Sequence, residues 1–252
     1  HIKVEPQRWY YACDRLGMIV WQDMPNGGLI DGELIAGLTL TVGWHRNDRR
    51  RLARFGRGQE HDRAQFRHEL QGMIDHLYNS ACVAVWVPFN ESWGQFEAKQ
   101  VADWAKKQDS TRLVDHASGW FDQGAGDFQS RHRYVAKLKP PKPDLRAFVL
   151  SETGGYSLAV PGHLWNEGKK FGYKFFKNAE EMTRAYCQLL QEQVKPLISH
   201  GLTGVVYTQT TDVEIEINGF LTYDRRVEKM DADVLRRLHT GLIEAGSSID
   251  MA

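Results

Sequence analysis

The chain has 252 residues, of which 42% are hydrophobic and 25% are charged, so its composition is that of one soluble α/β domain with a substantial core. Its 32 basic residues balance 32 acidic ones, which excludes the strong overall field that draws proteins to nucleic acids or anionic membranes. No apolar run approaches the roughly 20 residues that span a bilayer, and the first residues lack the order of a secretory signal. We therefore expect a soluble protein, cytoplasmic or periplasmic, with no signal peptide or transmembrane segment in the given chain.

Short apolar runs alternate with longer amphipathic ones, a pattern typical of βα units that build a parallel sheet covered by helices. The apolar runs predict strands at residues 17–22, 82–89, 112–116, 128–134, 146–151 and 203–209. The amphipathic runs predict helices at residues 6–16, 59–79, 93–108, 179–200 and 229–245. In the fourth of these helices, residues with the helical period predict a face that packs on the sheet: Met182, Tyr186, Leu189, Leu190, Val194 and Leu197.

Three segments depart from this alternation. Residues 118–127 are too rich in glycine for a helix and predict an active-site loop. Residues 137–143 contain three prolines and predict an extended linker around the domain. The arginine-rich segment 46–57 is interpreted as a solvated face or a flexible loop.

The sequence shows no motif that indicates a metal site or a cofactor. Cys13, Cys82 and Cys187 are far apart and lack the spacing of metal ligands, so we interpret them as buried thiols. No glycine-rich phosphate loop and no metal triad is recognised. We accordingly predict neither a metal site nor a cofactor.

Two glutamates stand at corresponding places in two predicted strands. The apolar run 83–89 leads into Asn90 and Glu91, and the apolar run 147–150 leads into Ser151 and Glu152. In a parallel barrel the ends of the strands gather functional groups at one face, so we expect both carboxyl groups to serve one cleft. Glycoside cleavage needs such a pair, one to protonate the leaving oxygen and one to attack the sugar or activate water. A structural role for each glutamate, as an ion-pair partner or a helix cap, is the competing interpretation.

Four motifs carry a resemblance that covers nearly the whole chain. They are residues 3–25, the run Trp86-Val87-Pro88-Phe89-Asn90-Glu91, the run Ser151-Glu152-Thr153-Gly154-Gly155-Tyr156, and the run from Tyr207 to Glu214. Together, and in this order, they resemble the catalytic TIM barrel of glycoside hydrolase family 2, which includes β-galactosidases, β-mannosidases and β-glucuronidases. The resemblance implies a retaining β-glycosidase with a two-glutamate double-displacement mechanism, in the first instance β-galactosidase-like, with a carbohydrate as its substrate.

The resemblance also implies roles for individual residues. Glu91 is expected to be the general acid/base and Glu152 the nucleophile. Asn90 is expected to bind the 2-hydroxyl of the sugar, and Tyr134 matches a tyrosine that hydrogen-bonds the nucleophile in related barrels. His1 stands where the second barrel strand of the family ends, so it is expected to face the sugar, although a frayed chain end is the alternative.

Further candidates for the sugar site are aromatic, amide and histidine side chains. Trp120 is the preferred aromatic platform because it lies in the glycine-rich loop, ahead of Trp93, Trp165 and Tyr173. Gln209 and Tyr207 stand where several relatives place tryptophan near the sugar ring, so the glycone stays open. The weaker candidates are His116 and His132, each of which is equally explained as a structural histidine.

The expected fold is a (β/α)8 TIM barrel that lacks its first strand–helix unit and most of its second strand. Residues 1–252 are then a single catalytic barrel domain, the C-terminal portion of a larger multidomain glycosidase. A barrel open in this way exposes unpaired strand edges, so we expect self-association through them. The alternative function is a truncated, catalytically incompetent barrel that at most binds carbohydrate.

Overall fold

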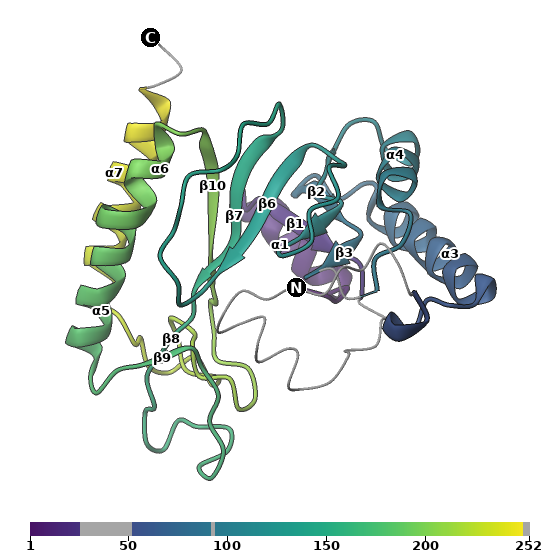
Figure 1. Ribbon diagram of the computed structural model, residues 1–252. Helices are drawn as coiled ribbons and strands as arrows, with labels where there is room; N and C mark the ends of the chain where they lie inside the picture. Colours follow the sequence, from purple (N-terminus) through teal and green to yellow (C-terminus); the bar gives the residue numbers. More distant parts are fainter. Residues whose placement is uncertain (26–51, 92–93, 249–252) are drawn as a thin grey trace. The chain divides into compact units, whose positions relative to one another are not determined.

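The computed structural model describes residues 1–25, 52–91 and 94–248, and these form two compact units (Figure 1). Unit 1 comprises residues 1–132 and 145–147, and unit 2 comprises residues 133–144 and 148–252. Residues 46–51 of the arginine-rich segment, and Trp93, lie outside the described residues. Of the helices in the described ranges, none combines the length and the hydropathy needed to cross a bilayer.

Unit 1 alternates helices with short strands, as the sequence predicts. Its strands β1 to β5 pair in parallel, in the order β1-β2-β4 and as the pair β3-β5. The elements are α1 (Gln7–Leu16), β1 (Val20–Asp23), the 3-10 turn η1 (Leu52–Phe55), α3 (Glu60–Leu77), β2 (Val83–Val87), β3 (Phe89–Asn90), α4 (Ala98–Gln108), β4 (Leu113–Val114), β5 (Ala117–Ser118) and β6 (Phe128–Arg133).

The core of unit 1 forms where the apolar face of α3 meets the strands. All five apolar side chains at its helical spacing are buried: Phe66, Leu70, Met73, Ile74 and Leu77. The ring of Phe66 stacks on Phe89 of β3 with 5.1 Å between centroids, and Phe96 meets both rings edge-on. This packing gives rigid support to the end of β3, which is Asn90, and to Glu91 directly after it.

The last residue of the arginine-rich segment belongs to this core. Arg57 is buried, and its guanidinium lies 4.6 Å from the centroid of the Phe66 ring. Its Nε donates to the Gly94 carbonyl at 3.2 Å. The interpretation of the segment as a solvated face is therefore wrong at Arg57.

Unit 2 contains the second set of elements, again with parallel strand pairs. β10 pairs with β7, and β8 pairs with β9. The elements are β7 (Ala147–Gly154), β8 (Tyr156–Ser157), β9 (Lys174–Phe175), α5 (Ala179–Gln188), the π-helical stretch η2 (Leu189–Val194), α6 (Lys195–Ile198), β10 (Leu202–Thr208) and α7 (Ala232–Ser247). The apolar stripe predicted for residues 182–197 is buried throughout, so its prediction as a core face is confirmed.

Several boundaries differ from the sequence prediction for local reasons. The helix predicted from residue 93 begins only at Ala98, because Gly94 and Glu97 have positive φ angles of 76° and 45°. The strand predicted to end at residue 151 continues to Gly154, because Tyr207 and Thr208 of β10 pair with Thr153 and Gly154. The helix predicted for residues 179–200 is interrupted by the π-helical turn η2.

The strand pairs do not close into a complete barrel within the described residues, and the fold they establish is mixed α/β with parallel strands. β10 stands at the edge of its sheet and exposes Val205 and Val206 at 37% and 45%. A parallel edge strand carries backbone donors and acceptors that another strand can use.

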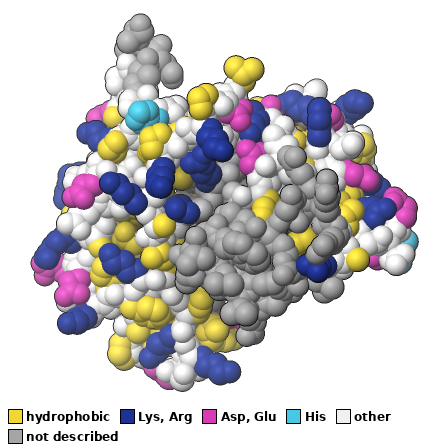
Figure 2. Space-filling view, in the orientation of Figure 1, with side chains coloured by type: hydrophobic (Ala, Val, Ile, Leu, Met, Phe, Trp, Pro, Cys, Tyr) yellow, Lys and Arg dark blue, Asp and Glu magenta, His cyan; other side chains and the backbone are white. Residues whose placement is uncertain are grey.

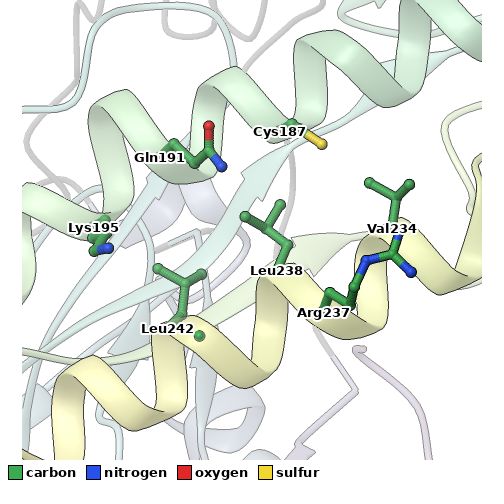
Figure 3. Close-up of a pocket in the computed structure, with 8 residues that line it drawn as sticks. Cys187, Gln191, Lys195, Val234, Arg237, Leu238 and Leu242 are labelled. Carbon is green, nitrogen blue, oxygen red and sulfur yellow. The ribbon is translucent and has the colours of Figure 1, made fainter.

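A groove runs between α7 and the helical segment α5–η2–α6 (Figure 3). Cys187, Gln191 and Lys195 line one side, and Arg237 and Leu238 belong to the α7 side. Because it lines this groove, Cys187 is only half-buried, and its prediction as a buried thiol is wrong, whereas Cys13 and Cys82 are buried.

Unit 1 buries an acidic side chain. Asp115 follows β4 with its side chain inaccessible to solvent, and burial raises the pKa of this carboxyl to about 7. The nearby Ser130 hydroxyl and the charge of His132 oppose the shift, while Asp23 and Asp122 add to it. The folded protein therefore holds a proton at Asp115 at pH values where the unfolded chain has lost it.

Unit 2 buries an ion pair. Lys229 Nζ donates to Asp212 Oδ1 at 2.6 Å and to the carbonyl of Ile217 at 2.9 Å, and the Gly219 N–H donates to the same carboxylate oxygen at 2.8 Å. The two charged side chains are 0% and 2% exposed. Burial lowers the pKa of Lys229 and raises that of Asp212, and their mutual attraction opposes both shifts. The pair joins the loop that follows β10 to the segment that enters α7.

Asp115→Asn should change how stability depends on pH. The raised pKa of Asp115 stabilises the fold at low pH, and this contribution is lost as the pH rises from about 4 to about 7. Each tenfold difference in proton affinity between the folded and unfolded states is equivalent to about 1.4 kcal/mol. The variant should therefore gain stability relative to wild type as the pH rises through this range, measured by urea unfolding.

The control for this experiment is Asp103→Asn, at an exposed carboxylate on α4. Its unfolding free energy should follow that of wild type at every pH. Parallel pH curves for Asp115→Asn and wild type would contradict the prediction.

Lys229→Met should destabilise the protein by about 3–5 kcal/mol, because it leaves a buried carboxylate without its cation. Urea unfolding at pH 7 measures the loss. Lys177→Met, at an exposed lysine, is the matched control, and an equal effect of the two substitutions would show that the ion pair does not stabilise the fold.

The exposed edge of β10 should support self-association. Sedimentation velocity is expected to show an average mass that rises with protein concentration, and Val206→Lys should reduce the rise because a lysine on an edge strand disfavours pairing. Ile243→Lys, on the 70% exposed Ile243 of α7, is the control. A monomer at all concentrations would exclude this association.

Candidate active site

The first candidate carboxylate, Glu91, follows directly on β3. Parallel pairing aligns Asn90 with Ser118 of β5, the Glu91 N–H donates to the Ser118 carbonyl at 2.6 Å, and the Ser118 hydroxyl donates to Asn90 Oδ1 at 2.8 Å. Glu91 has a φ of 48°, an uncommon conformation for a residue with a side chain. Such conformations cluster at functional positions, and Glu91 adopts this one at the point where its N–H bonds to β5.

His132 of β6 completes this group of residues, which we call the Glu91 cluster: Asn90, Glu91, Ser118, Gly119 and His132. Its Nδ1 lies 3.1 Å from Glu91 Oε1, and the ring is buried. Gly119, with a φ of 112°, makes room for this approach, since a Cβ there would lie 3.1 Å from both His132 Nδ1 and the Glu91 Cα. Glu91 itself retains 17% side-chain exposure and is reachable from solvent.

The glycine-rich loop begins beside the Glu91 cluster and is held by a different histidine. His116 is buried, its Nε2 accepts the Gln123 N–H at 3.1 Å, and burial lowers its pKa to about 4, so it is neutral at pH 7. Arg146 clamps Asp122 of the same loop with bonds of 2.9 and 2.6 Å. Trp120 lies half-exposed in this loop, two residues after Ser118.

The second candidate carboxylate, Glu152, lies in β7 and belongs to unit 2. The Tyr134 hydroxyl donates to Glu152 Oε2 at 2.6 Å, and the Thr208 hydroxyl donates to the same oxygen at 3.2 Å. Thr208 reaches Glu152 because it ends β10, which pairs in parallel with β7. These three residues form the Glu152 cluster, in which two hydroxyl donors fix the orientation of one carboxylate oxygen.

The two glycines after Glu152 admit two aromatic rings. Gly154 and Gly155 have φ angles of 85° and 68°, and a Cβ at these positions would lie 2.4 Å from the Tyr207 ring and 2.2 Å from the Tyr173 ring. Tyr207 is anchored through its hydroxyl, which accepts the Tyr156 N–H at 3.0 Å. The run Glu152-Thr153-Gly154-Gly155 therefore combines a carboxylate with a backbone that aromatic side chains closely approach.

Three further predicted site residues have contacts elsewhere in the chain. His1 is 59% exposed in its side chain and lies 3.7 Å from Asp23, whose carboxylate accepts the Ile2 N–H. Gln209 donates from its side chain to Asn218 Oδ1 at 2.8 Å, in the loop after β10. Trp165 is exposed at 62%, edge-on to Tyr223.

Three contacts were not predicted from the sequence. The sequence does not indicate Ser118 or Thr208 as site residues. Ser118 begins the predicted glycine-rich loop, and Thr208 lies near the end of a predicted strand. His132 was named only as a weaker candidate, and its contact with Glu91 depends on strands 41 residues apart in the chain.

Chemically, each cluster presents a reachable carboxylate with defined partners. Glu91 has an imidazole beside it, whereas Glu152 has two hydroxyl donors. Different surroundings are what a pair of carboxyl groups needs if one is to transfer protons and the other is to attack.

Comparison with known proteins identifies a family. The TIM barrel domain of glycosyl hydrolases family 2 matches residues 5–138. A search of curated proteins finds no match.

Solved structures share the fold at low sequence identity. A β-glucuronidase from an uncultured Clostridium sp. matches with a TM-score of 0.61 and 13% identity, over 95% of this chain and 43% of that one. A β-D-glucuronidase for Dictyoglomus thermophilum gives 0.60 and 13%, over 94% and 43%. A family 2 β-galacturonidase from Eisenbergiella tayi, bound to galacturonate, gives 0.56 and 14%, over 92% and 42%.

The chain thus spans less than half the length of these structures, which share its fold. The family match covers more than half of the chain and includes Asn90, Glu91, His132 and Tyr134. On this evidence the chain belongs to glycoside hydrolase family 2.

Proposed function

We propose that this chain forms part of a (β/α)8 catalytic domain that hydrolyses β-glycosides with retention of configuration. The observation that carries the proposal is the 2.6 Å hydrogen bond from Tyr134 to Glu152, because it presents a carboxylate in the orientation that a nucleophile must keep throughout the reaction. Family membership and the His132–Glu91 contact support it.

In the first step, the Glu152 carboxylate attacks the anomeric carbon while Glu91 transfers its proton to the leaving oxygen. The glycosidic C–O bond breaks, and an ester joins the sugar to Glu152. In the second step, Glu91 takes a proton from water, the water oxygen attacks the anomeric carbon, and Glu152 is released as a carboxylate. This route requires the two carboxyl groups to stand about 5 Å apart.

The surrounding residues have supporting roles in the proposal. Tyr134 and Thr208 hold Glu152 on its line of attack, and His132 orients Glu91. Asn90, whose amide is fixed by Ser118, is the residue that binds the 2-hydroxyl of the sugar.

More distant residues complete the proposed sugar site. Trp120 offers a half-exposed ring for the apolar side of a pyranose. His1 and Gln209 are the other proposed contacts of the sugar.

The glycone is proposed by class. A β-galactoside is the first candidate, and β-glucuronides and β-galacturonides are the second, because structures with those names share the fold. The alternative is a domain that binds carbohydrate without turnover. It predicts that the sugar binds but forms no covalent adduct.

The test is intact mass spectrometry after incubation with activated 2-fluoro glycosides of galactose, glucose, mannose, glucuronic acid and galacturonic acid. One of these should leave a covalent adduct, and peptide mapping should place it on Glu152. Glu152→Ala should abolish the adduct and lower turnover of the matching aryl glycoside by at least about a thousandfold. Glu91→Ala should lower turnover by about 10²–10⁴-fold, and less for good leaving groups, because these need no proton.

Glu192→Gln, at an exposed glutamate of η2, is the matched control and should retain full activity. An adduct on another carboxylate would overturn the assignment of the nucleophile. Binding of the sugars without any adduct would favour the carbohydrate-binding alternative.

A further inference from the structure

The side chain of Tyr173 lies directly against the tyrosine that holds Glu152. The rings of Tyr134 and Tyr173 stack with 4.0 Å between centroids and 2° between planes. Tyr173 is half-buried and ends the segment 158–173, which we call the β8–β9 loop. The Tyr134 hydroxyl that donates to Glu152 is thus carried by a ring whose face is covered by another segment of unit 2.

Tyr134 lies outside the regular secondary structure. It follows β6, and residues 134–146 form neither helix nor strand. On its two sides, the Thr153 hydroxyl donates to the Arg133 carbonyl at 2.8 Å, and the Leu138 N–H donates to Gln193 Oε1 at 3.0 Å. These bonds hold the backbone on both sides of Tyr134, and the stack on Tyr173 restrains its ring.

The β8–β9 loop, in contrast, is held firmly on both sides of Tyr173. After it, β9 pairs with β8, and the Phe176 N–H donates to the Ser157 carbonyl at 2.9 Å. Before it, the Phe171 N–H donates to the Ile215 carbonyl at 2.7 Å, and the Phe171 carbonyl accepts the Ile217 N–H at 3.0 Å. The Phe171 ring meets Tyr173 edge-on at 5.5 Å.

Two glycines make the approach of this loop sterically feasible. A Cβ at Gly155, three residues after Glu152, would lie 2.2 Å from Tyr173 Cδ2. A Cβ at Gly172 would lie 1.8 Å from Ser157 Oγ. Gly155 therefore leaves room for the Tyr173 ring, and Gly172 lets the residue before Tyr173 approach Ser157.

Figure 2 shows hydrophobic side chains interspersed with lysine and arginine on the surface of the protein. In the β8–β9 loop, Trp165 and Phe171 are exposed at 62% and 40%, and Phe175 of β9 is exposed at 57%. Phe175 has the exposure of a surface residue and offers a comparison with Tyr173, whose ring covers Tyr134.

We infer that Tyr173 is a positioning residue, which acts on the reaction by holding Tyr134 in the orientation that hydrogen-bonds Glu152. The inference rests on the proposed function of Glu152 as nucleophile. A stacked ring restrains the side-chain torsions of its partner, so loss of the stack should weaken the hydrogen bond from Tyr134 to Glu152 Oε2. The aromatic face of Tyr173, and not its hydroxyl, provides this restraint.

The kinetic test compares Tyr173→Ala, Tyr173→Phe, Tyr134→Phe and the double variant Tyr134→Phe/Tyr173→Ala. Tyr173→Ala should lower kcat by roughly tenfold with KM changed less than about twofold, and Tyr173→Phe should restore kcat because it keeps the stacked ring. In the Tyr134→Phe background, Tyr173→Ala should have no further effect, because the hydroxyl that it positions is gone. Phe175→Ala is the control and should match wild type.

Three results would overturn the inference: additive losses in the double variant, equal losses in Tyr173→Phe and Tyr173→Ala, or a change in KM alone. Thermal unfolding is measured for every variant. If Tyr173→Ala does not fold, Tyr173→Leu replaces it, since leucine keeps apolar volume without a planar ring.

A second measurement does not need an active enzyme. Proton NMR of the wild type should show a slowly exchanging hydroxyl resonance from Tyr134, which is absent in Tyr134→Phe. Tyr173→Phe should retain this resonance. In Tyr173→Ala the hydroxyl proton should exchange at least about tenfold faster. This pattern without any glycoside turnover would refute the proposed function and leave intact only the restraint of Tyr134 by Tyr173. Turnover and an adduct on Glu152 with an unchanged resonance in Tyr173→Ala would refute the positioning role alone.

Discussion

Parallel pairing of strands is the interaction on which both carboxylate clusters depend. In the pairs β1–β2, β2–β4, β3–β5, β7–β10 and β8–β9 the two strands run in the same direction, so their carboxyl ends lie together. Pairing of β3 with β5 brings Ser118 to Asn90 and Glu91, and pairing of β10 with β7 brings Thr208 to Glu152. The hydrophobic faces of α3 and α5 contribute to the cores of their units and supply no member of either cluster.

Close approach of side chains to the backbone is the second constraint, and glycines satisfy it. Gly119 admits His132 next to Glu91, and Gly155 admits Tyr173 next to the segment that follows Glu152. Glu91 occupies the left-handed region although it carries a side chain. A conformation of this kind costs of order 1–3 kcal/mol, which the surrounding structure has to offset.

Buried charge is distributed differently in the two units. Unit 1 places Asp115 and the neutral His116 near its loop and cluster, each with a pKa shifted toward the neutral form by burial. Unit 2 instead buries a complete ion pair, Asp212 with Lys229, in the loop beyond β10. The first arrangement makes stability depend on pH, whereas the second adds a buried ion pair to the other hydrogen bonds of the loop after Thr208.

Much of this protein follows from its sequence, because hydrophobic periodicity and strand-end position are local properties. The stripe from Met182 to Leu197 and the apolar run from Val83 to Val87 specify buried elements, and the resemblance selected Glu91 and Glu152 as the candidate carboxylates. Such patterns do not predict the start of α4, which depends on positive φ angles, or the extension of β7, which depends on pairing with β10. They do not predict the π-helical turn either. Tertiary structure alone decided which side chains meet each carboxylate: His132 lies 41 residues from Glu91, and Thr208 lies 56 residues from Glu152. No local pattern encodes such contacts, since they exist only once distant strands have paired.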